Sequence, residues 1–292
     1  MSNRNVVTLA AMAVVLSAIG CMQYNVDVSV NPDGSGQRTV VIELDGAPAD
    51  SVAQLLPLGD GGWIASVEQD QDGKARHLYR RESKLRGLDD WSAAGGLLVR
   101  GEAGGRVRLV SEVSVEQVRT TAGVQHVYRE TLRWEHLRLE VAAHAANVFA
   151  AWLGDLQPAL PPAVVDEMRG VVAAAVAMGW QDVGAEDSDA EDRIEREILT
   201  LVEDRLGRAG VPAARAAEIR TQAEDCDLMT GIEKRLPGLG LALESGFELR
   251  VTMPGRISGG NADLVEGNVA VWKVDLARVT GRPLTLVAES GR

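Results

Sequence analysis

The chain has 292 residues, and its 42 acidic residues outnumber its 30 basic residues, which gives a formal net charge of −12 at pH 7. A chain this acidic repels phosphate backbones, which argues against nucleic acid as a partner. Its length allows one large core or two modest ones, and an aromatic content of only 4% argues against a carbohydrate cleft built on stacked rings.

The first predicted element is an N-terminal export signal. Arg4 precedes an uncharged, mostly apolar stretch from Val6 to Gly20, which is shorter than the ~20 residues needed to span a bilayer. The stretch ends in Ala18-Ile19-Gly20-Cys21, which matches a lipobox, the signal for cleavage before a cysteine that receives diacylglycerol. We therefore expect cleavage between Gly20 and Cys21. The alternative is an ordinary secretory signal or a short membrane anchor, with Cys21 incidental.

A lipidated Cys21 predicts an extracytoplasmic protein that is held to a membrane by its N-terminal lipid. The acidic surface is repelled by anionic headgroups, so we expect the lipid rather than the protein surface to provide the attachment. Residue 22 is Met rather than Asp, which by analogy with enteric bacteria favours the outer membrane if the cell has one. In a cell with a single membrane, the protein would face outward from that membrane.

Strand and turn patterns dominate from Gln23 to about Trp134. Tyr24–Val30 alternates apolar and polar residues, as expected of a strand that is buried on one face. The turn formers Asn31–Gly36 follow, and Thr39–Leu44 is the expected partner strand.

Two further hairpins are expected in this N-terminal part. They pair residues 63–68 with 75–81, and 106–118 with 124–134. Short helical pieces are expected at 48–56 and 88–94.

Apolar residues recur with a helical period from about His136 to Leu236. This period predicts four helices, over residues 139–153, from 161 to 179, from 188 to 206, and from 212 to 219 with an extension to 232. Ser188 and Glu191 have the spacing of a capping box at the start of the third helix. We expect the apolar stripes to pack against one another, with a lipid groove between the helices as the alternative.

Strand patterns return after Gly246, at 247–253, 269–276 and 284–288. We therefore predict an α+β fold, with an antiparallel sheet formed from N- and C-terminal strands and a helical insert between them. The predicted division is a signal peptide at 1–20, a β-rich part at 21–135, a helical insert at 136–239, and strands that complete the sheet at 240–292. The alternative is two sequential domains with a boundary near residue 135.

No residue pattern indicates catalysis, a metal site or a cofactor. The sequence lacks a nucleophile elbow, a phosphate-binding loop and a zinc-protease motif. The four histidines lack metal-ligand spacing, and the acidic run 186–192 lacks the glycine and glutamate of a calcium loop. A lipidated Cys21 leaves Cys226 without an intrachain disulfide partner, and its acidic neighbours disfavour the thiolate, so we expect an inert thiol.

Both ends of the chain resemble a known family. The lipobox, the following strand and Pro32–Gly36 are similar to the opening of bacterial lipoproteins of the mycobacterial LppM type. Later segments carry the Pro-Gly turn, the Asn-containing loop and the Trp-bearing strand of that family, at Met253–Ile257, Asn261–Ala262, Gly267–Asn268, Val271–Lys273 and Leu286–Ser290. The resemblance implies an envelope-facing α+β module that binds lipid or glycolipid, without established catalysis. The central helical stretch does not share the resemblance.

The expected function is that of a lipid-anchored, non-catalytic envelope protein, which works as a binding or assembly module at the membrane surface. Its expected partners are the membrane, through the lipid on Cys21, and a lipid or another envelope protein. One alternative is a lipid or glycolipid carrier in which the helices roof an apolar cavity. The other is an envelope hydrolase without a recognisable motif.

Overall fold

The computed structural model of the protein describes most of the chain after the predicted signal. The described residues are 21–46, 49–58, 62–69, 73, 75–92, 96–101, 106–121, 123–179, 190–223, 226 and 228–291. The signal peptide, Gly20 and Ser188 lie outside these residues, as do residues 186–189 of the acidic run.

The strands form two sheets. The first, sheet A, has the strand order β11 (Leu264–Glu266), β12 (Val269–Asp275), β9 (Gly246–Thr252), β1 (Cys21–Val30), β2 (Gly36–Asp45), β5 (Ala75–Leu85) and β4 (Trp63–Gln69). The second, sheet B, has the order β10 (Arg256–Gly260), β13 (Leu284–Gly291), β8 (Gly123–Glu135), β7 (Arg106–Thr120), β6 (Gly96–Arg100) and β3 (Leu55–Leu58).

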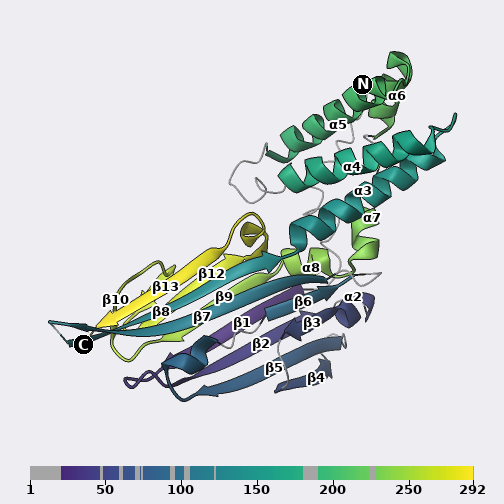
Figure 1. Ribbon diagram of the computed structural model, residues 1–292. Coiled ribbons are helices and arrows are strands. Elements are labelled where there is room, and N and C mark those ends of the chain that lie inside the picture. Colours follow the sequence, from purple (N-terminus) through teal and green to yellow (C-terminus); the bar gives the residue numbers. More distant parts are fainter. Residues whose placement is uncertain are drawn as a thin grey trace, which may run out of the picture.

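Helices and short helical turns connect these strands. They are α2 (Ala49–Gln54), η1 (Leu88–Ser92), α3 (Leu137–Asp155), α4 (Pro162–Gly179), α5 (Ala190–Arg208), α6 (Ala213–Ala223), α7 (Leu228–Arg235), α8 (Leu239–Leu243) and η3 (Leu276–Val279). Figure 1 shows α3 to α6 extending away from one end of the sheets, whereas the C-terminus lies at the opposite end. We call this projection the helical arm.

The core lies between the inner faces of the two sheets and continues into the helical arm. Alternate residues of β1 face inward, and Tyr24 and Val26 are fully buried there. Sheet B contributes its own alternating series from β7 and β8, including Leu109 and Leu132. In the arm, apolar side chains of successive helices join the same buried cluster, among them Phe149 of α3, Met168 of α4 and Val202 of α5. Each sheet therefore covers the apolar face of the other.

The predicted α+β class is confirmed, with strands from both ends of the chain joined around a helical insert. The three predicted hairpins are present as the antiparallel pairs β1–β2, β4–β5 and β7–β8. Two features were not predicted. The strands divide between two sheets, and β1 runs parallel to β9, with Gln23 opposite Gly246. The predicted fourth helix is interrupted, because α6 ends at Ala223 and α7 begins at Leu228.

Close packing brings α7 against α3. A Cβ atom on Gly231 of α7 would lie 2.6 Å from Cγ2 of Val148, which is closer than a carbon contact allows. Glycine at this position therefore permits the approach of the two helices, which ties the end of the helical insert back to its beginning.

Candidate functional site

The predicted lipidation residue stands at the first position of sheet A. Strand β1 begins at Cys21, whose backbone is already paired with that of Asp45 in β2. The partners of the following residues continue without a break to Val30 opposite Gly36. The residue that the lipobox marks therefore lies within the paired part of β1.

Strand register identifies what surrounds Cys21. Because β9 is parallel to β1, its first residue, Gly246, lies opposite Gln23, and Asp275 at the end of β12 lies opposite Gly246. Helix α8 contacts both β1 and η3. We call this end of the sheets the anchor end. It contains the starts of β1, β9 and β13 and the ends of β2, β8 and β12.

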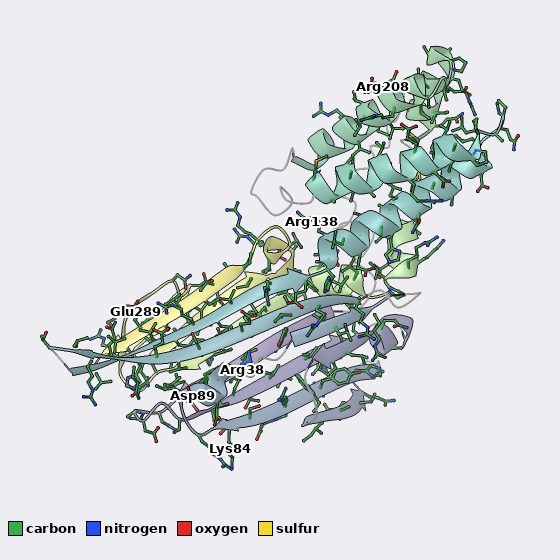
Figure 2. The ribbon with its side chains drawn as sticks, viewed as in Figure 1. Arg38, Lys84, Asp89, Arg138, Arg208 and Glu289 are labelled. Carbon is green, nitrogen blue, oxygen red and sulfur yellow. The ribbon has the colours of Figure 1, made fainter. Side chains whose placement is uncertain are left out.

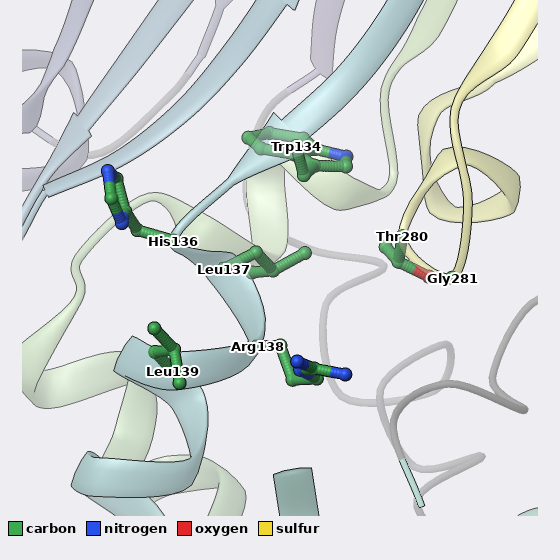
Figure 3. A pocket seen from close by; sticks show the side chains of 7 residues that line it. All are labelled: Trp134, His136, Leu137, Arg138, Leu139, Thr280 and Gly281. Carbon is green, nitrogen blue, oxygen red and sulfur yellow. The ribbon is translucent and has the colours of Figure 1, made fainter. Parts of the chain in front are cut away.

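A cleft of about 260 Å³ opens at the anchor end, between the start of α3 and the turn after η3. Its lining residues come from these two segments and the end of β8, and they are Trp134, His136, Leu137, Arg138, Leu139, Thr280 and Gly281. The Trp134 indole N–H donates to the carbonyl of Leu276 at 3.2 Å, which fixes the ring against η3. Figure 3 shows Arg138 on the side of Thr280 and Gly281, with His136 pointing away from them.

The arginines of the cleft differ from those on the outer face of sheet B. Arg108 and Arg133 both contact the carboxylate of Glu135, at 3.3 and 3.0 Å. In contrast, Arg138 and the neighbouring Arg282 are exposed and have no ion-pair partner in the part of the chain that the structure describes. The cleft therefore carries positive charge that the described carboxylates do not neutralise.

A second polar cluster lies deep between the two sheets. Arg38 of β2 donates to Oε1 of Glu130 in β8 at 2.6 Å and to Oγ of Ser111 at 3.1 Å. Tyr128 donates to Oε2 of the same carboxylate at 2.6 Å, and Ser111 donates to Oε1. Glu130 is fully buried, and Arg38 is 5% exposed. Figure 2 shows Arg38 among the strands of both sheets, so the ion pair joins sheet A to sheet B.

Burial and the ion pair shift the pKa values in this buried cluster. Burial, with the nearby Glu130 carboxylate as a second cause, raises the pKa of Tyr128 well above its ordinary value. Burial also raises the pKa of Tyr24 to about 12, against the opposing effect of Arg38. For Arg38, burial alone would lower the pKa, but Glu130 and the two tyrosines raise it overall. The guanidinium thus stays charged and the phenols stay neutral at physiological pH.

We expect Tyr24→Phe to leave the free energy of unfolding unchanged or to raise it by up to about 1 kcal/mol, because its buried hydroxyl has no hydrogen-bond partner among the described residues. The matched control is Tyr128→Phe, which removes a hydrogen bond to a carboxylate and should cost about 1.5–3 kcal/mol. Urea denaturation of both variants measures the difference. A loss in Tyr24→Phe as large as that in Tyr128→Phe would contradict the prediction and indicate a bound water on the Tyr24 hydroxyl.

The four histidines and Cys226 are dispersed over the fold. His126 is buried against the carbonyl of Pro32, His144 is buried in α3, His77 is half-buried and His136 is exposed. Cys226 is buried. Across the described ranges, no group of three or more His, Cys, Asp or Glu side chains is arranged to hold a metal ion. Within the same ranges, every helix is too short or too polar to cross a bilayer.

The sequence pattern singled out neither the cleft nor the buried ion pair. A signal for the ion pair was present, because Arg38 and Glu130 occupy inward-facing positions of alternating strands. The cleft had no comparable signal, since it is formed by segments that are more than 140 residues apart in the chain, as the Trp134–Leu276 hydrogen bond illustrates with its separation of 142.

Comparisons with known proteins give one match. No family model matches the chain, and no curated protein matches it. Among solved structures, the chain is similar to the NMR structure of the folded domain of the Mycobacterium tuberculosis LppM protein, with 11% sequence identity and a TM-score of 0.31. The match covers 93% of this chain and 91% of that chain. This is a weak resemblance at the level of the fold.

Proposed function

We propose that the protein is a lipid-anchored lipoprotein of the cell envelope, whose folded part is a non-catalytic binding or assembly module at the membrane surface. The observation that carries this proposal is the pairing of Cys21, the residue that the lipobox marks for diacylglycerol, with Asp45 in sheet A. Because the Cys21 backbone is already paired with Asp45, no flexible linker separates the predicted lipid from sheet A. A lipid at this position holds the anchor end next to the headgroups on the extracytoplasmic side.

The buried carboxylate of Glu130 has a structural role in this proposal. Glu130 is fully buried and is engaged by Arg38, Ser111 and Tyr128, so its oxygens are committed to joining the two sheets. A general acid or base must reach a substrate, and this group does not reach the surface. An arrangement of the two sheets that separated this pair would leave a charge uncompensated in the core, which is costly, so the pair has a structural role.

Cys21→Ala is expected to abolish incorporation of a radiolabelled fatty acid and to release the protein from the membrane, because a thiol is required to receive the diacylglycerol. Cys226→Ala is the matched control, since it removes the other cysteine of the chain and should leave labelling unchanged. The measurement is label per protein after expression in a bacterial host that processes lipoproteins. Equal labelling of the wild type and Cys21→Ala would refute the lipid anchor.

A further inference from the structure

The cleft at the anchor end is placed to face the membrane if Cys21 carries a lipid, so this inference rests on the proposed function. Strand register puts Cys21, Gly246 and Asp275 at one end of sheet A. The turn η3 follows Asp275 directly, and the segment after it lines the cleft. With no linker between Cys21 and β1, the orientation of the sheets relative to the bilayer is restricted, and this end is the one brought to the headgroups.

Charge around the cleft favours an anionic group. Two nearby carboxylates already have partners: Glu135 contacts Arg108 and Arg133, and the Asp275 carboxylate accepts from the backbone N–H of Ala277. Arg138 and Arg282, by contrast, are exposed and without an ion-pair partner in the described ranges. In a chain with a net charge of −12, two unpaired arginines beside the predicted anchor form a local exception to the acidic surface.

Size and side-chain type favour a lipid headgroup over a whole lipid. The cleft holds about 260 Å³, which is below the ~300–1,000 Å³ typical of clefts that enclose drug-sized ligands. Trp134 forms part of its wall, and tryptophan, like tyrosine, is enriched at the interface between membrane and water. Leu139, which also lines the cleft, is 62% exposed, and an exposed leucine next to arginine suits the same interface.

We propose that this cleft is the surface through which the anchored protein contacts the bilayer, with the phosphate of an anionic phospholipid held by Arg138. Trp134 and Leu139 lie at headgroup depth, and Arg282 contributes to the attraction. The lipid on Cys21 supplies the attachment, and the cleft sets the orientation, because a tethered group needs little intrinsic affinity to occupy its site. Because the helical arm leaves the sheets at this same end (Figure 1), the contact lays the arm along the bilayer surface.

The test uses residues 21–292, which contain every described residue, with Cys226→Ala so that Cys21 is the one thiol for coupling to a maleimide lipid. Vesicles consist of phosphatidylcholine alone or of an equal mixture with phosphatidylglycerol. We expect amide hydrogen exchange at residues 136–140 and 280–283 to be about fivefold slower on the mixed vesicles than on phosphatidylcholine alone. A fivefold ratio corresponds to the roughly 1 kcal/mol that one arginine gains beside an anionic surface.

Arg138→Glu is expected to remove this difference between the two vesicles, whereas Arg256→Glu should retain it. Arg256 is the matched control because it is exposed in β10, near the C-terminal end of the sheets. Equal exchange on both vesicles, or protection at residues 118–124 instead of the cleft, would overturn the proposal. The chemical tether replaces biological lipidation, so this result and the labelling of Cys21 can fail independently.

Discussion

Glu130→Ala is expected to lower the free energy of unfolding by about 3–5 kcal/mol, because removing one partner of a buried ion pair leaves the other charge without compensation. The charge left behind is the guanidinium of Arg38, which is 5% exposed and donates to Glu130 at 2.6 Å. Tyr128 and Ser111 lose their acceptor in the same variant. Urea denaturation monitored by tryptophan fluorescence measures the change.

Two matched variants separate burial from charge. Glu112→Ala breaks the ion pair with Arg133, which has the same 2.6 Å distance, but Glu112 is 56% exposed, so the expected cost is only about 0–1 kcal/mol. The double variant Arg38→Met with Glu130→Leu removes both charges and leaves only the neutral hydroxyls of Tyr128 and Ser111 without their acceptor, so it should be more stable than Glu130→Ala. A single Glu130→Ala variant as mild as Glu112→Ala would show that the pair does not hold the sheets together.

Much of the β-structure could be predicted because its signals are local. Tyr24–Val30 and Thr39–Leu44 alternate strictly, and turn formers stand between them, so both the strands and their pairing are encoded within about 20 residues. The long pair β7–β8 follows from the same pattern, with one register from Arg108 opposite Glu135 to Thr120 opposite Gly123. Local encoding of this kind makes hairpins the most predictable part of the fold.

Short strands and distant pairings had no such signal. Strands β3 and β11 have four and three residues, too few for an alternating pattern. Strand β10 contains Gly259 and Gly260, a residue type that disfavours strands, yet a Cβ atom on Gly260 would lie 2.0 Å from the carbonyl oxygen of Val287. Glycine there permits the close approach of β10 to β13, with a positive φ of 125°. The parallel pairing of β1 with β9 joins segments more than 200 residues apart, which no window of sequence reveals.

The contact between Arg38 and Glu130 could not be predicted from the pattern of either strand. Arg38, Val40, Ile42 and Leu44 share the inward face of β2, so the arginine stood out as a charge at a core position. Glu130 likewise stands between the buried Tyr128 and Leu132 in β8. Each charge could be noticed from its own strand. Their contact could not, because it requires sheet A to be laid over sheet B across a sequence separation of 92 residues.

Trp272→Ala is expected to lower the free energy of unfolding by about 3–5 kcal/mol, since it removes a large side chain that is only 2% exposed. The loss extends beyond packing. The indole N–H of Trp272 donates to both oxygens of Asn261, at 3.0 Å to the backbone oxygen and 3.1 Å to Oδ1. Asn261 in turn binds β13, through Oδ1 to the Val287 N–H at 2.7 Å and through Nδ2 to the Thr285 carbonyl at 2.8 Å.

Trp272 and Asn261 thus join β12 of sheet A to β13 of sheet B, as Arg38 and Glu130 join the sheets deeper in the core. Trp272→Phe should recover part of the stability, because it keeps an aromatic ring and loses only the indole donor, whose net worth is about 0.5–1.5 kcal/mol. Leu264→Ala, at a neighbouring position that is 51% exposed, should change the free energy by less than about 0.5 kcal/mol. If Trp272→Phe were as unstable as Trp272→Ala, the hydrogen bonds through Asn261, rather than the packing of the ring, would hold this edge of the two sheets together.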